Sequence, residues 1–399
     1  MSIGVNYTLH GVLLLCLTNS LYLVVLCLYN VTWLRCNGRM PFRASGFEFN
    51  PDPNRAQTRN SELETRNLAG IPRLQYGSVN LSIWRQPMGT TLVTGLGLVG
   101  TSYAQNALKR GESVVFYDMA PRKDFLANKL GTANVTVVQR DIRDLPSLIE
   151  TIQKHKCDTV LHTAGLIGGK VGNPIYAGLQ INVMGTINVA EAVRLCGVKR
   201  LIQISTFGVY DRRQGEPTPL GEDFRRGPGE AYGNSKVAKE LMVEAYQRMF
   251  GFELIVLRLA NVYGVGHFAG GSGGGEMVQN MLQTGIKGGV VKISQEVARD
   301  FEYVYYKDLG RALDKAATTP LKDPVTLNIG TGVVIKFDDL VATAEKLLPK
   351  LQVEITPGPK PRSAKQPMVI AKAKEVLGWT PDYDIVAGFK DYIEELKAL

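Results

Sequence analysis

The sequence lacks several patterns that would by themselves assign a function. No Cys-x-x-Cys pair occurs, and the cysteines are odd in number: Cys16, Cys27, Cys36, Cys157 and Cys196. This spacing suits neither a metal site nor a disulfide framework, so we expect no metal and a reducing compartment for the folded body. The net charge of +9 comes without a dense Lys/Arg run interleaved with aromatics, which argues against a nucleic-acid partner. A basic cleft for an anionic small molecule fits this charge better.

Lysine is absent from the first 87 residues. Within them, residues 12–31 are mostly apolar and about as long as a membrane span, and Arg35, Arg39 and Arg43 follow. By the positive-inside rule, a body anchored through this segment would face the cytoplasm. We therefore expect residues 1–35 to be either a membrane anchor or an extension outside the fold, with the body cytoplasmic in both cases. Residues 36–87 are polar with weak periodicity, which predicts a disordered linker.

From Met88 onward, β-branched apolar runs alternate with amphipathic stretches. Alternation of this kind predicts an α/β fold, a Rossmann-like doubly wound parallel sheet with helices on both faces. We expect this domain to span residues 88–265 and a smaller mixed α/β part, which would cover a ligand cleft, to span 266–399. Predicted strands are 91–94, 114–117, 135–138, 159–162, 200–204, 253–257, 290–293 and 327–329, and predicted helices are 99–110, 145–155, 174–196, 231–250, 276–284, 308–317, 337–348 and 385–396. Residues 268–275 are expected to form a flexible glycine loop.

A glycine turn follows the first predicted strand of this body. Gly95, Gly97 and Gly100 have G-x-G-x-x-G spacing, and Asp118 ends the second strand 21 residues after Gly97. The glycines allow a tight turn, close approach to a pyrophosphate and close packing of helix on strand, and the helix start at Leu98 and Val99 favours phosphate. A carboxylate at Asp118 would accept the ribose hydroxyls and repel a 2′-phosphate. The turn alone is a weak signal, but its context predicts NAD rather than NADP.

Two Tyr-x-x-x-Lys pairs occur, although composition alone yields roughly one by chance. Tyr232 and Lys236 lie in a helical pattern, where residues four apart share a face. Tyr303 lies in a strand-like run, so its spacing from Lys307 has no such meaning. A tyrosine hydroxyl beside a lysine ammonium can act as acid or base, and Lys236 could also hold the nicotinamide ribose. Alternatively, the pair is a surface Tyr and Lys on an amphipathic helix.

Two hydroxyls follow the strand predicted at 200–204. Side chains at the carboxyl end of a parallel strand face the ligand cleft, so Thr206 or Ser205 could bind the same substrate oxygen as Tyr232. Alternatively, either residue caps the local turn.

The chain from Met88 resembles an extended short-chain dehydrogenase/reductase of the NAD-dependent epimerase/dehydratase family. Beyond the glycine turn and Tyr232–Lys236, several segments match the family's landmarks in order. The resemblance implies that Thr206 is the catalytic hydroxyl, with Tyr232 and Lys236, and that Ser205, Asn261 and Arg299 face substrate. It implies a cofactor site formed by Gly95, Gly97, Leu98, Val99, Gly100, Asp118, Asp141, Ile142, Thr163, Ala164, Gly165, Asn182, Tyr232 and Lys236.

Departures from the family's pattern narrow the reaction. Phe207 and Gly208 follow Thr206, where dehydratases and decarboxylases of sugar nucleotides carry an acid, which argues against both reactions. The glycine turn is one residue shorter than in the family's usual pattern, which affects the contacts to the cofactor phosphates. Two extra residues separate Arg299 from Asp308, which weakens the match of Arg299 to the family's diphosphate contact.

These features predict an NAD-dependent epimerase or dehydrogenase acting on a secondary hydroxyl or keto group of a sugar or sugar nucleotide. One alternative is a membrane-associated steroid or lipid-alcohol dehydrogenase of the same superfamily, which the apolar N-terminus favours. Another is a non-catalytic NAD-binding sensor, which would not need Thr206, Tyr232 and Lys236 together. The helical patterns at 174–196 and 231–250 would suit a homodimer.

Overall fold

The computed structural model describes residues 89–131, 135–211, 219–267, 272–359 and 366–399, together with the backbone of four strands before them. The chain divides into two units, Met1–Val79 and Asn80–Leu399.

The four N-terminal strands form an antiparallel sheet in the order β1-β2-β3-β4: β1 (Thr8–Leu9), β2 (Val12–Leu17), β3 (Ser20–Cys27) and β4 (Asn30–Arg35). Strands β2 and β3 therefore occupy most of the apolar stretch that the sequence marked as a membrane span. Among the described residues, no helix is both long and apolar enough to cross a bilayer. The transmembrane prediction is thus without support, and the linker predicted at 36–87 lies outside the described residues.

A seven-stranded parallel sheet forms the centre of the second unit, in the order β14-β10-β9-β8-β5-β6-β7. Strands β5, β6 and β7 follow one another toward one edge of the sheet, and strands β8, β9, β10 and β14 follow one another toward the other edge. The strand order therefore reverses between β5 and β8. The carboxyl ends of strands at such a reversal form the crevice where ligands bind in open α/β sheets. The strands are β5 (Thr90–Thr94), β6 (Ser113–Asp118), β7 (Val135–Gln139), β8 (Thr159–His162), β9 (Arg200–Thr206), β10 (Glu253–Leu259) and β14 (Val325–Ile329).

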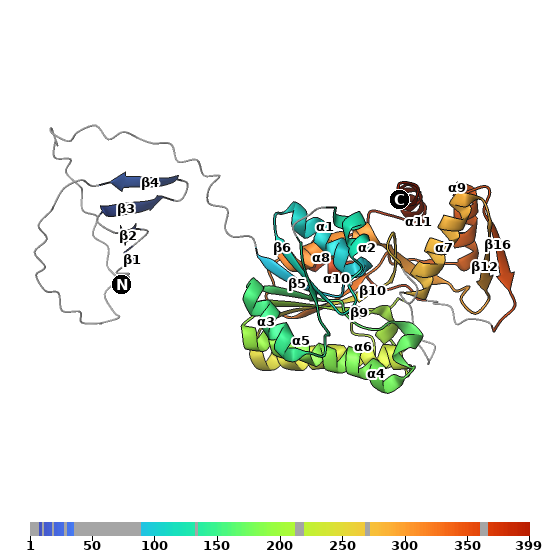
Figure 1. Ribbon diagram of the computed structural model, residues 1–399, viewed down its shortest axis with the longest axis horizontal. Helices are drawn as coiled ribbons and strands as arrows, with labels where there is room; N and C mark the ends of the chain where they lie inside the picture. Colours follow the sequence, from blue (N-terminus) through green and yellow to red (C-terminus); the bar gives the residue numbers. More distant parts are fainter. Residues whose placement is uncertain are drawn as a thin grey trace, which may run out of the picture. The chain divides into compact units, whose positions relative to one another are not determined.

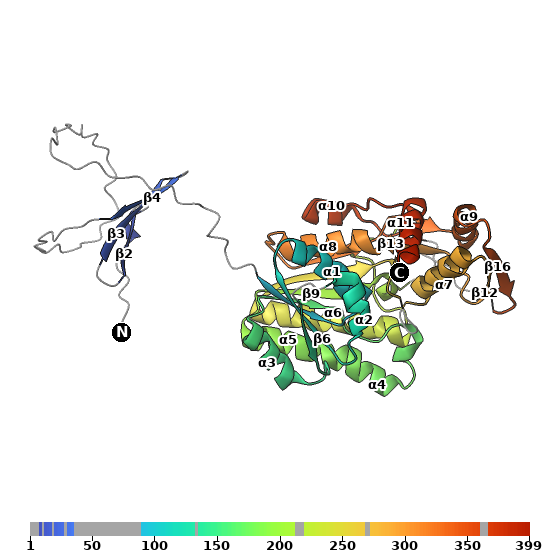
Figure 2. The same cartoon turned by 45° about the horizontal axis from the view of Figure 1, so that its top comes forward.

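Helices cover both faces of this sheet, as the alternating pattern predicts (Figures 1 and 2). One face carries α3 (Leu145–His155), α5 (Gly185–Cys196) and α6 (Ala231–Phe250), and the other carries α1 (Leu98–Lys109) and α8 (Tyr306–Thr318). Two buried apolar clusters result, and the larger one continues into the C-terminal part through residues such as Phe389 and Tyr392. The Rossmann-like fold with a smaller C-terminal part is therefore confirmed.

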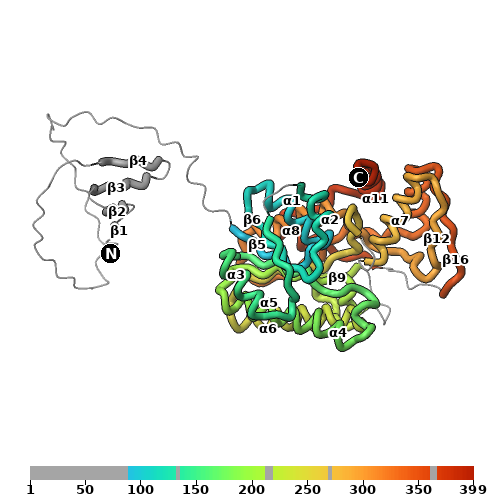
Figure 3. The backbone as a smooth tube through the Cα atoms, in the orientation of Figure 1, coloured from blue at the N-terminus to red at the C-terminus, as the bar shows by residue number. Residues whose placement is uncertain are grey.

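The C-terminal part is mixed α/β. Strands β12 (Val290–Ser294) and β16 (Gln352–Thr356) pair in parallel beside α7 (Gly273–Lys287) and α9 (Phe337–Leu347), as the tube in Figure 3 traces. A small sheet links the two parts in the order β11-β13-β15. Its strands are β11 (Asn261–Tyr263), β13 (Phe301–Tyr305) and β15 (Val334–Ile335), and the remaining helices are α2 (Lys123–Leu130), α4 (Ile175–Leu179), α10 (Ala371–Leu377) and α11 (Ile385–Lys397).

Two local predictions need correction. The glycine loop expected at 268–275 ends earlier, because Gly273, Gly274 and Gly275 form the first turn of α7. A Cβ on Gly274 or Gly275 would collide with the side chain of Asn261 or His267, so glycine permits this close approach. The helix expected at 174–196 is interrupted by a π-helical turn, Gln180–Met184, between α4 and α5.

Candidate active site

The glycine turn has the geometry expected of a dinucleotide site. Gly95 has φ +89, and a Cβ there would lie 3.0 Å from the Ala164 backbone nitrogen, so this position requires glycine. A Cβ on Gly100 would lie 2.5 Å from the Gly95 carbonyl oxygen, so α1 packs directly on the turn. In contrast, no atom lies within 4 Å of a Cβ built on Gly97. No side chain caps the α1 N-terminus, which begins at Leu98 and Val99, so its free N–H groups can receive phosphate.

Asp118 lies beside this turn at the end of β6. Its Oδ2 accepts a hydrogen bond from the Leu96 N–H at 2.7 Å, and its Oδ1 accepts one from the Ala120 N–H at 2.7 Å. Each carboxylate oxygen keeps a further lone pair, so the group can also accept from a ribose diol. Arg122 donates to the Gly266 carbonyl at 3.2 Å and lies 4.2 Å from the Phe125 ring centroid, so these contacts hold its guanidinium against the segment after β11.

Asp141 and Ile142 follow β7. Hydrogen bonds from Arg143 hold the pKa of Asp141 below its usual value, and Arg143 Nε lies 3.0 Å from Asp141 Oδ1. Ile142 is buried against Gly185, where a Cβ would lie 2.7 Å from the Ile142 Cγ2. Both residues thus have contacts within the protein, and their role in binding adenine stays a prediction.

The segment after β8 is held by buried hydrogen bonds. Thr163 Oγ1 donates to the Thr94 carbonyl at 2.6 Å and so ties this segment to the glycine turn. Asn182, in the π-helical turn, accepts from the Leu166 N–H at 2.7 Å and donates to the Leu166 carbonyl at 3.1 Å. π-Helical turns recur at functional sites, and here the turn directs Asn182 to the backbone beside Ala164 and Gly165.

The structure brings Thr206, Tyr232 and Lys236 together. Thr206 is the last residue of β9, and Tyr232 lies in the first turn of α6. The two side chains meet beside Gly208, where a built Cβ would lie 3.5 Å from Thr206 Oγ1 and 3.9 Å from Tyr232 Cε1. Lys236 Nζ lies 5.8 Å from the Tyr232 ring centroid and donates to the Ile204 carbonyl at 3.3 Å. The other pair, Tyr303 and Lys307, is divided between β13 and α8, as the sequence predicted.

Burial controls the proton affinities of this cluster. It raises the pKa of Tyr232 to about 12, and the hydrogen bond with Thr206 offsets only part of this effect. Burial also lowers the pKa of Lys236 to about 8, against a smaller opposing effect of Glu240. In the free protein Tyr232 is therefore a neutral acid, and it needs added positive charge nearby to act as a base.

Ser205, predicted to face substrate, is buried and its hydroxyl donates to Glu240. Glu240 also accepts from Arg258 Nη2 at 2.8 Å and from Arg226 Nη1 at 2.9 Å. Burial alone would raise the pKa of Glu240, but Arg258 and its other partners hold it below the usual value. The Ser205 hydroxyl thus belongs to an ionic network that joins α6 to β9 and β10. Because its hydrogen is donated to Glu240, this hydroxyl could contact a substrate only as a hydrogen-bond acceptor.

The other two predicted substrate residues lie in separate segments. Asn261, the first residue of β11, accepts from Ser272 Oγ at 2.5 Å, and its buried Nδ2 makes no hydrogen bond within the described protein. Arg299 lies between β12 and β13, and its Nε donates to the Glu296 carbonyl at 2.9 Å. Their contact with substrate is a prediction.

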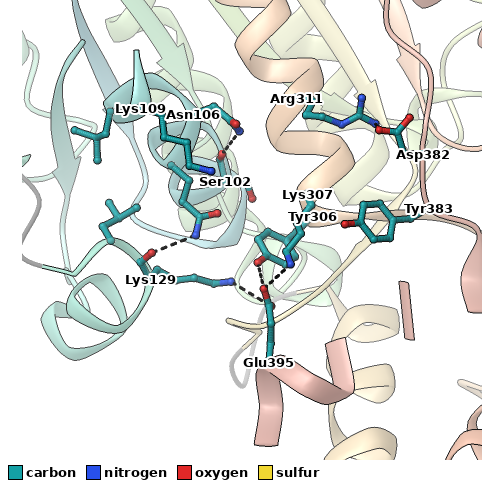
Figure 4. Close-up of a pocket in the computed structure, with 13 residues that line it drawn as sticks. Ser102, Asn106, Lys109, Lys129, Tyr306, Lys307, Arg311, Asp382, Tyr383 and Glu395 are labelled. Atoms are coloured by element: carbon teal, nitrogen blue, oxygen red, sulfur yellow. Dashed lines mark hydrogen bonds and ion pairs between the residues drawn. The ribbon is translucent and has the colours of Figure 1, made fainter. Parts of the chain in front are cut away.

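A cavity of about 660 Å³ lies elsewhere, between α1, α2, α8 and α11 (Figure 4). Lys129 approaches from α2, and Tyr306 and Lys307 from α8, to meet Glu395 of α11. None of the predicted site residues lines this cavity. We therefore assign the candidate active site to the crevice at the carboxyl ends of the strands.

Sequence reasoning missed Lys239 and Glu240, both fully buried on α6. Helical periodicity could have found them, because residues 232, 236, 239 and 240 lie on one face of a helix. A charged residue on a face that must pack against a sheet signals a partner or a function.

Comparisons with known proteins identify the family of this chain. The sequence profile described as "NAD dependent epimerase/dehydratase family" matches residues 91–330. The chain is 28% identical over 312 residues to a putative UDP-glucose 4-epimerase of Methanocaldococcus jannaschii, covering 77% of this chain and 98% of that protein. It is 28% identical over 311 residues to the UDP-glucose 4-epimerase of Mycolicibacterium smegmatis, covering 76% and 97%. A structure of MoeE5 in complex with UDP-glucose and NAD is also similar, with TM-score 0.66, 25% identity and coverage of 78% and 99%.

Proposed function

The chain belongs to the NAD-dependent epimerase/dehydratase family, and we propose that it epimerises a sugar nucleotide by NAD-dependent oxidation and re-reduction at one hydroxyl carbon. The observation that carries this proposal is the cluster of Thr206, Tyr232 and Lys236. The cluster lies at the carboxyl ends of the parallel strands, and the glycine turn follows β5 at the same edge of the sheet. The UDP-glucose 4-epimerases that match along 97% or more of their own length support the choice of reaction.

The residues present fit NAD. The open space at Gly97 and the uncapped start of α1 would take the diphosphate, and Asp118 would take the adenosine ribose. Lys236, one turn from Tyr232, would hold the nicotinamide ribose. When bound, NAD supplies the chemistry of accepting a hydride from the substrate carbon and returning it.

Tyr232 moves the proton. Its oxygen would accept the substrate hydroxyl proton as that carbon is oxidised and give it back on reduction. Since burial raises the pKa of Tyr232 to about 12, the positive charges of Lys236 and of the nicotinamide are needed to favour the phenolate. Thr206 would hydrogen-bond the same substrate oxygen and hold it in line with Tyr232.

Elimination is disfavoured because it needs an acid or base besides Tyr232. Phe207, directly after Thr206, lies in a short 3₁₀ turn and packs edge-on against Phe301, with ring centroids 6.1 Å apart. Neither Phe207 nor Gly208 can supply that acid or base. This environment supports epimerisation over dehydration or decarboxylation.

The test is to incubate the full-length chain with NAD and, one at a time, with UDP-, GDP- and dTDP-sugars, simple alcohols, steroids and lipid alcohols, and to identify the products by NMR and mass spectrometry. We expect a new epimer at constant NAD. Accumulation of NADH with one sugar or alcohol would replace the epimerase by a dehydrogenase, and turnover of steroids or lipid alcohols alone would favour the membrane-associated alternative. Bound NAD without any turnover would overturn the enzyme assignment in favour of a sensor.

A homodimer through α5 and α6 is part of this proposal. Large apolar side chains are exposed on these helices: Leu195, Leu241, Met249 and Phe250. Exposed apolar side chains favour an interaction site, and a second copy would present the same residues. Analytical ultracentrifugation should give twice the chain mass, and Met249→Glu, which places a charge at the most exposed of these positions, should give a monomer. A monomeric wild type would refute the dimer.

Membrane association through residues 12–31 is still a prediction from composition. Flotation of the full chain with phosphatidylcholine vesicles would test it, with a chain lacking residues 1–87 as control. Equal recovery of both proteins in the lipid-free fraction would refute it.

A further inference from the structure

Helix α6 holds a second buried lysine one turn beyond Lys236. Lys239 is 1% exposed, against 5% for Lys236, and is among the largest fully buried side chains. No part of the proposed reaction uses it. Residues three apart lie on the same face of a helix, so both lysines are directed to the inside of the protein.

Lys239 contacts the segment that is predicted to lie under the cofactor. Its Nζ donates to the Ala164 carbonyl at 3.2 Å. Gly165 has φ +154, and a Cβ there would lie 3.4 Å from Lys239 Nζ and 3.0 Å from Asn182 Oδ1. Because Asn182 holds both polar groups of the Leu166 backbone, Lys239 and Asn182 together support three consecutive residues, 164–166.

Lys239 lacks the compensation that buried cations normally have. Within the described part of the chain no carboxylate oxygen lies within 4 Å of its Nζ. The titratable groups near Lys239 are Lys236, whose charge lowers the pKa of Lys239, and His162, whose pKa both lysines lower. His162 supplies no charge, since burial and the two lysines hold its pKa well below the usual value, and its ring is hydrogen-bonded to Thr94 and Thr186. Burial and the charge of Lys236 likewise lower the pKa of Lys239. A neutral amine still donates to Ala164, so the contact does not depend on charge.

An apolar side chain would be the cheaper choice for stability. Replacing buried charged groups by apolar residues of similar volume is often neutral or stabilising. A lysine kept here without an ion pair therefore indicates a role beyond packing.

We propose that Lys239 is a positioning residue for NAD: through its hydrogen bond to the Ala164 carbonyl it holds residues 164–166 at the position that the bound dinucleotide requires. This inference rests on the proposed function, since it takes that segment as part of the NAD site. It assigns a role to a residue that the family's Tyr-x-x-x-Lys motif does not contain.

The test compares NAD binding and stability in full-length variants by titration calorimetry and thermal unfolding. Lys239→Met keeps an unbranched apolar stem but loses the terminal donor, and we expect NAD to bind about tenfold more weakly, with an unchanged or raised unfolding temperature. Lys239→Gln keeps a donor on a chain one atom shorter, and we expect a loss of about two- to fivefold. Lys199→Met, the same change at a lysine with a 72% exposed side chain, serves as control and should leave both quantities unchanged.

An unchanged NAD affinity in either folded Lys239 variant would overturn the proposal. If Lys239→Met does not fold, the Lys239→Gln titration decides alone. A wild-type chain that binds no NAD would instead refute the proposed function, so the two failures are distinguishable.

Discussion

Two regions of the molecule bury lysines in opposite ways. At the cavity of Figure 4, Lys307 Nζ lies 2.5 Å from Asp391 Oδ2 and 3.0 Å from Glu395 Oε1, and Lys129 lies over the Tyr306 ring, 3.8 Å from its centroid, and 3.9 Å from Glu395 Oε2. In the crevice, Lys236 and Lys239 donate to the backbone carbonyls of Ile204 and Ala164, and no ion pair holds either lysine within the described chain.

The proton affinities follow these environments. Burial alone would lower the pKa of Lys307, but Asp391 and Glu395 raise it above its usual value. For Lys236 burial dominates and the pKa falls to about 8, and for Lys239 no carboxylate opposes the effect. A compensated lysine stabilises the fold, whereas a lysine left without a partner is costly and is retained where ligand chemistry needs it. Lys129 is an intermediate case, because burial lowers its pKa to about 8 although Glu395 opposes the effect. The clearest contrast is therefore between Lys307 and the two lysines of the crevice.

The largest expected effect on turnover comes from removing the hydroxyl of Tyr232 in the crevice, compared with removing the hydroxyl of Tyr306 at the cavity. Tyr232→Phe removes the proposed acid/base and should lower kcat by roughly 10³–10⁴-fold while NAD affinity changes by less than about threefold. Tyr306→Phe, which removes the hydrogen bond to Glu395, is the matched control and should retain turnover. Epimer formation and NAD titration measure both. A Tyr232→Phe enzyme with normal turnover would remove Tyr232 from the mechanism.

Replacing one lysine of each region by methionine tests the difference between the two regions. Lys236→Met should lower kcat by about 10²-fold, because the phenolate of Tyr232 loses its stabilising cation. Lys307→Met should keep kcat within about threefold but destabilise the protein, since Asp391 and Glu395 lose their cation. Steady-state kinetics and urea unfolding of both variants measure these effects. Equal kinetic losses in the two variants would contradict the division between the regions.

The pH dependence of stability tests the uncompensated lysine. The folded-state pKa of Lys236 is about 8 and lies below its unfolded value of 10.5, so the unfolded chain binds the extra proton between them. The penalty is complete below pH 8 and is relieved as the pH rises, so stability increases with pH. Relative to Lys236→Met, the wild type should gain about 2 kcal/mol in unfolding free energy between pH 7 and 10. Parallel urea-unfolding curves for the two proteins would show that Lys236 carries no such penalty.

The smallest effect is expected at the compensated site. Glu395→Gln removes the charge shared by Lys129 and Lys307 and should lower the unfolding free energy by about 1 kcal/mol without changing turnover. Glu394→Gln, next to it and exposed, should change stability by less than about 0.5 kcal/mol. Urea unfolding compares the two. A loss of turnover in Glu395→Gln would mean that the cavity is coupled to the crevice.

Much of the fold was predictable because its signals are local. Strand β8 and helices α3 and α6 have the predicted bounds, and most of the other predicted elements differ from the structure by a few residues. Elements such as α2, α10 and β16 were not predicted. Period-2 and period-3.6 patterns are decided by neighbouring residues, so they can be recognised without the tertiary structure. The glycine loop was wrong in part, because glycine composition does not reveal that α7 approaches Asn261 and His267 closely enough to exclude a Cβ.

The candidate site divides in the same way. Gly95, Gly100 and the Tyr232–Lys236 pair depend on turn conformation, local packing and helical spacing, which a sequence displays. The engagement of Ser205 by Glu240, 35 residues away, depends on how α6 packs on β9.

By itself, the sequence determined the order of strands and helices, the glycine turn and the helix that carries Tyr232 and Lys236. Only the tertiary structure decided which charges are compensated: it placed Glu395 beside Lys129, 266 residues earlier in the chain, and Lys239 beneath Ala164, 75 residues earlier, without a carboxylate. The physical reason is that backbone conformation responds to neighbours within one or two turns. The cost of burying a charge depends instead on every atom that packing brings within a few ångströms.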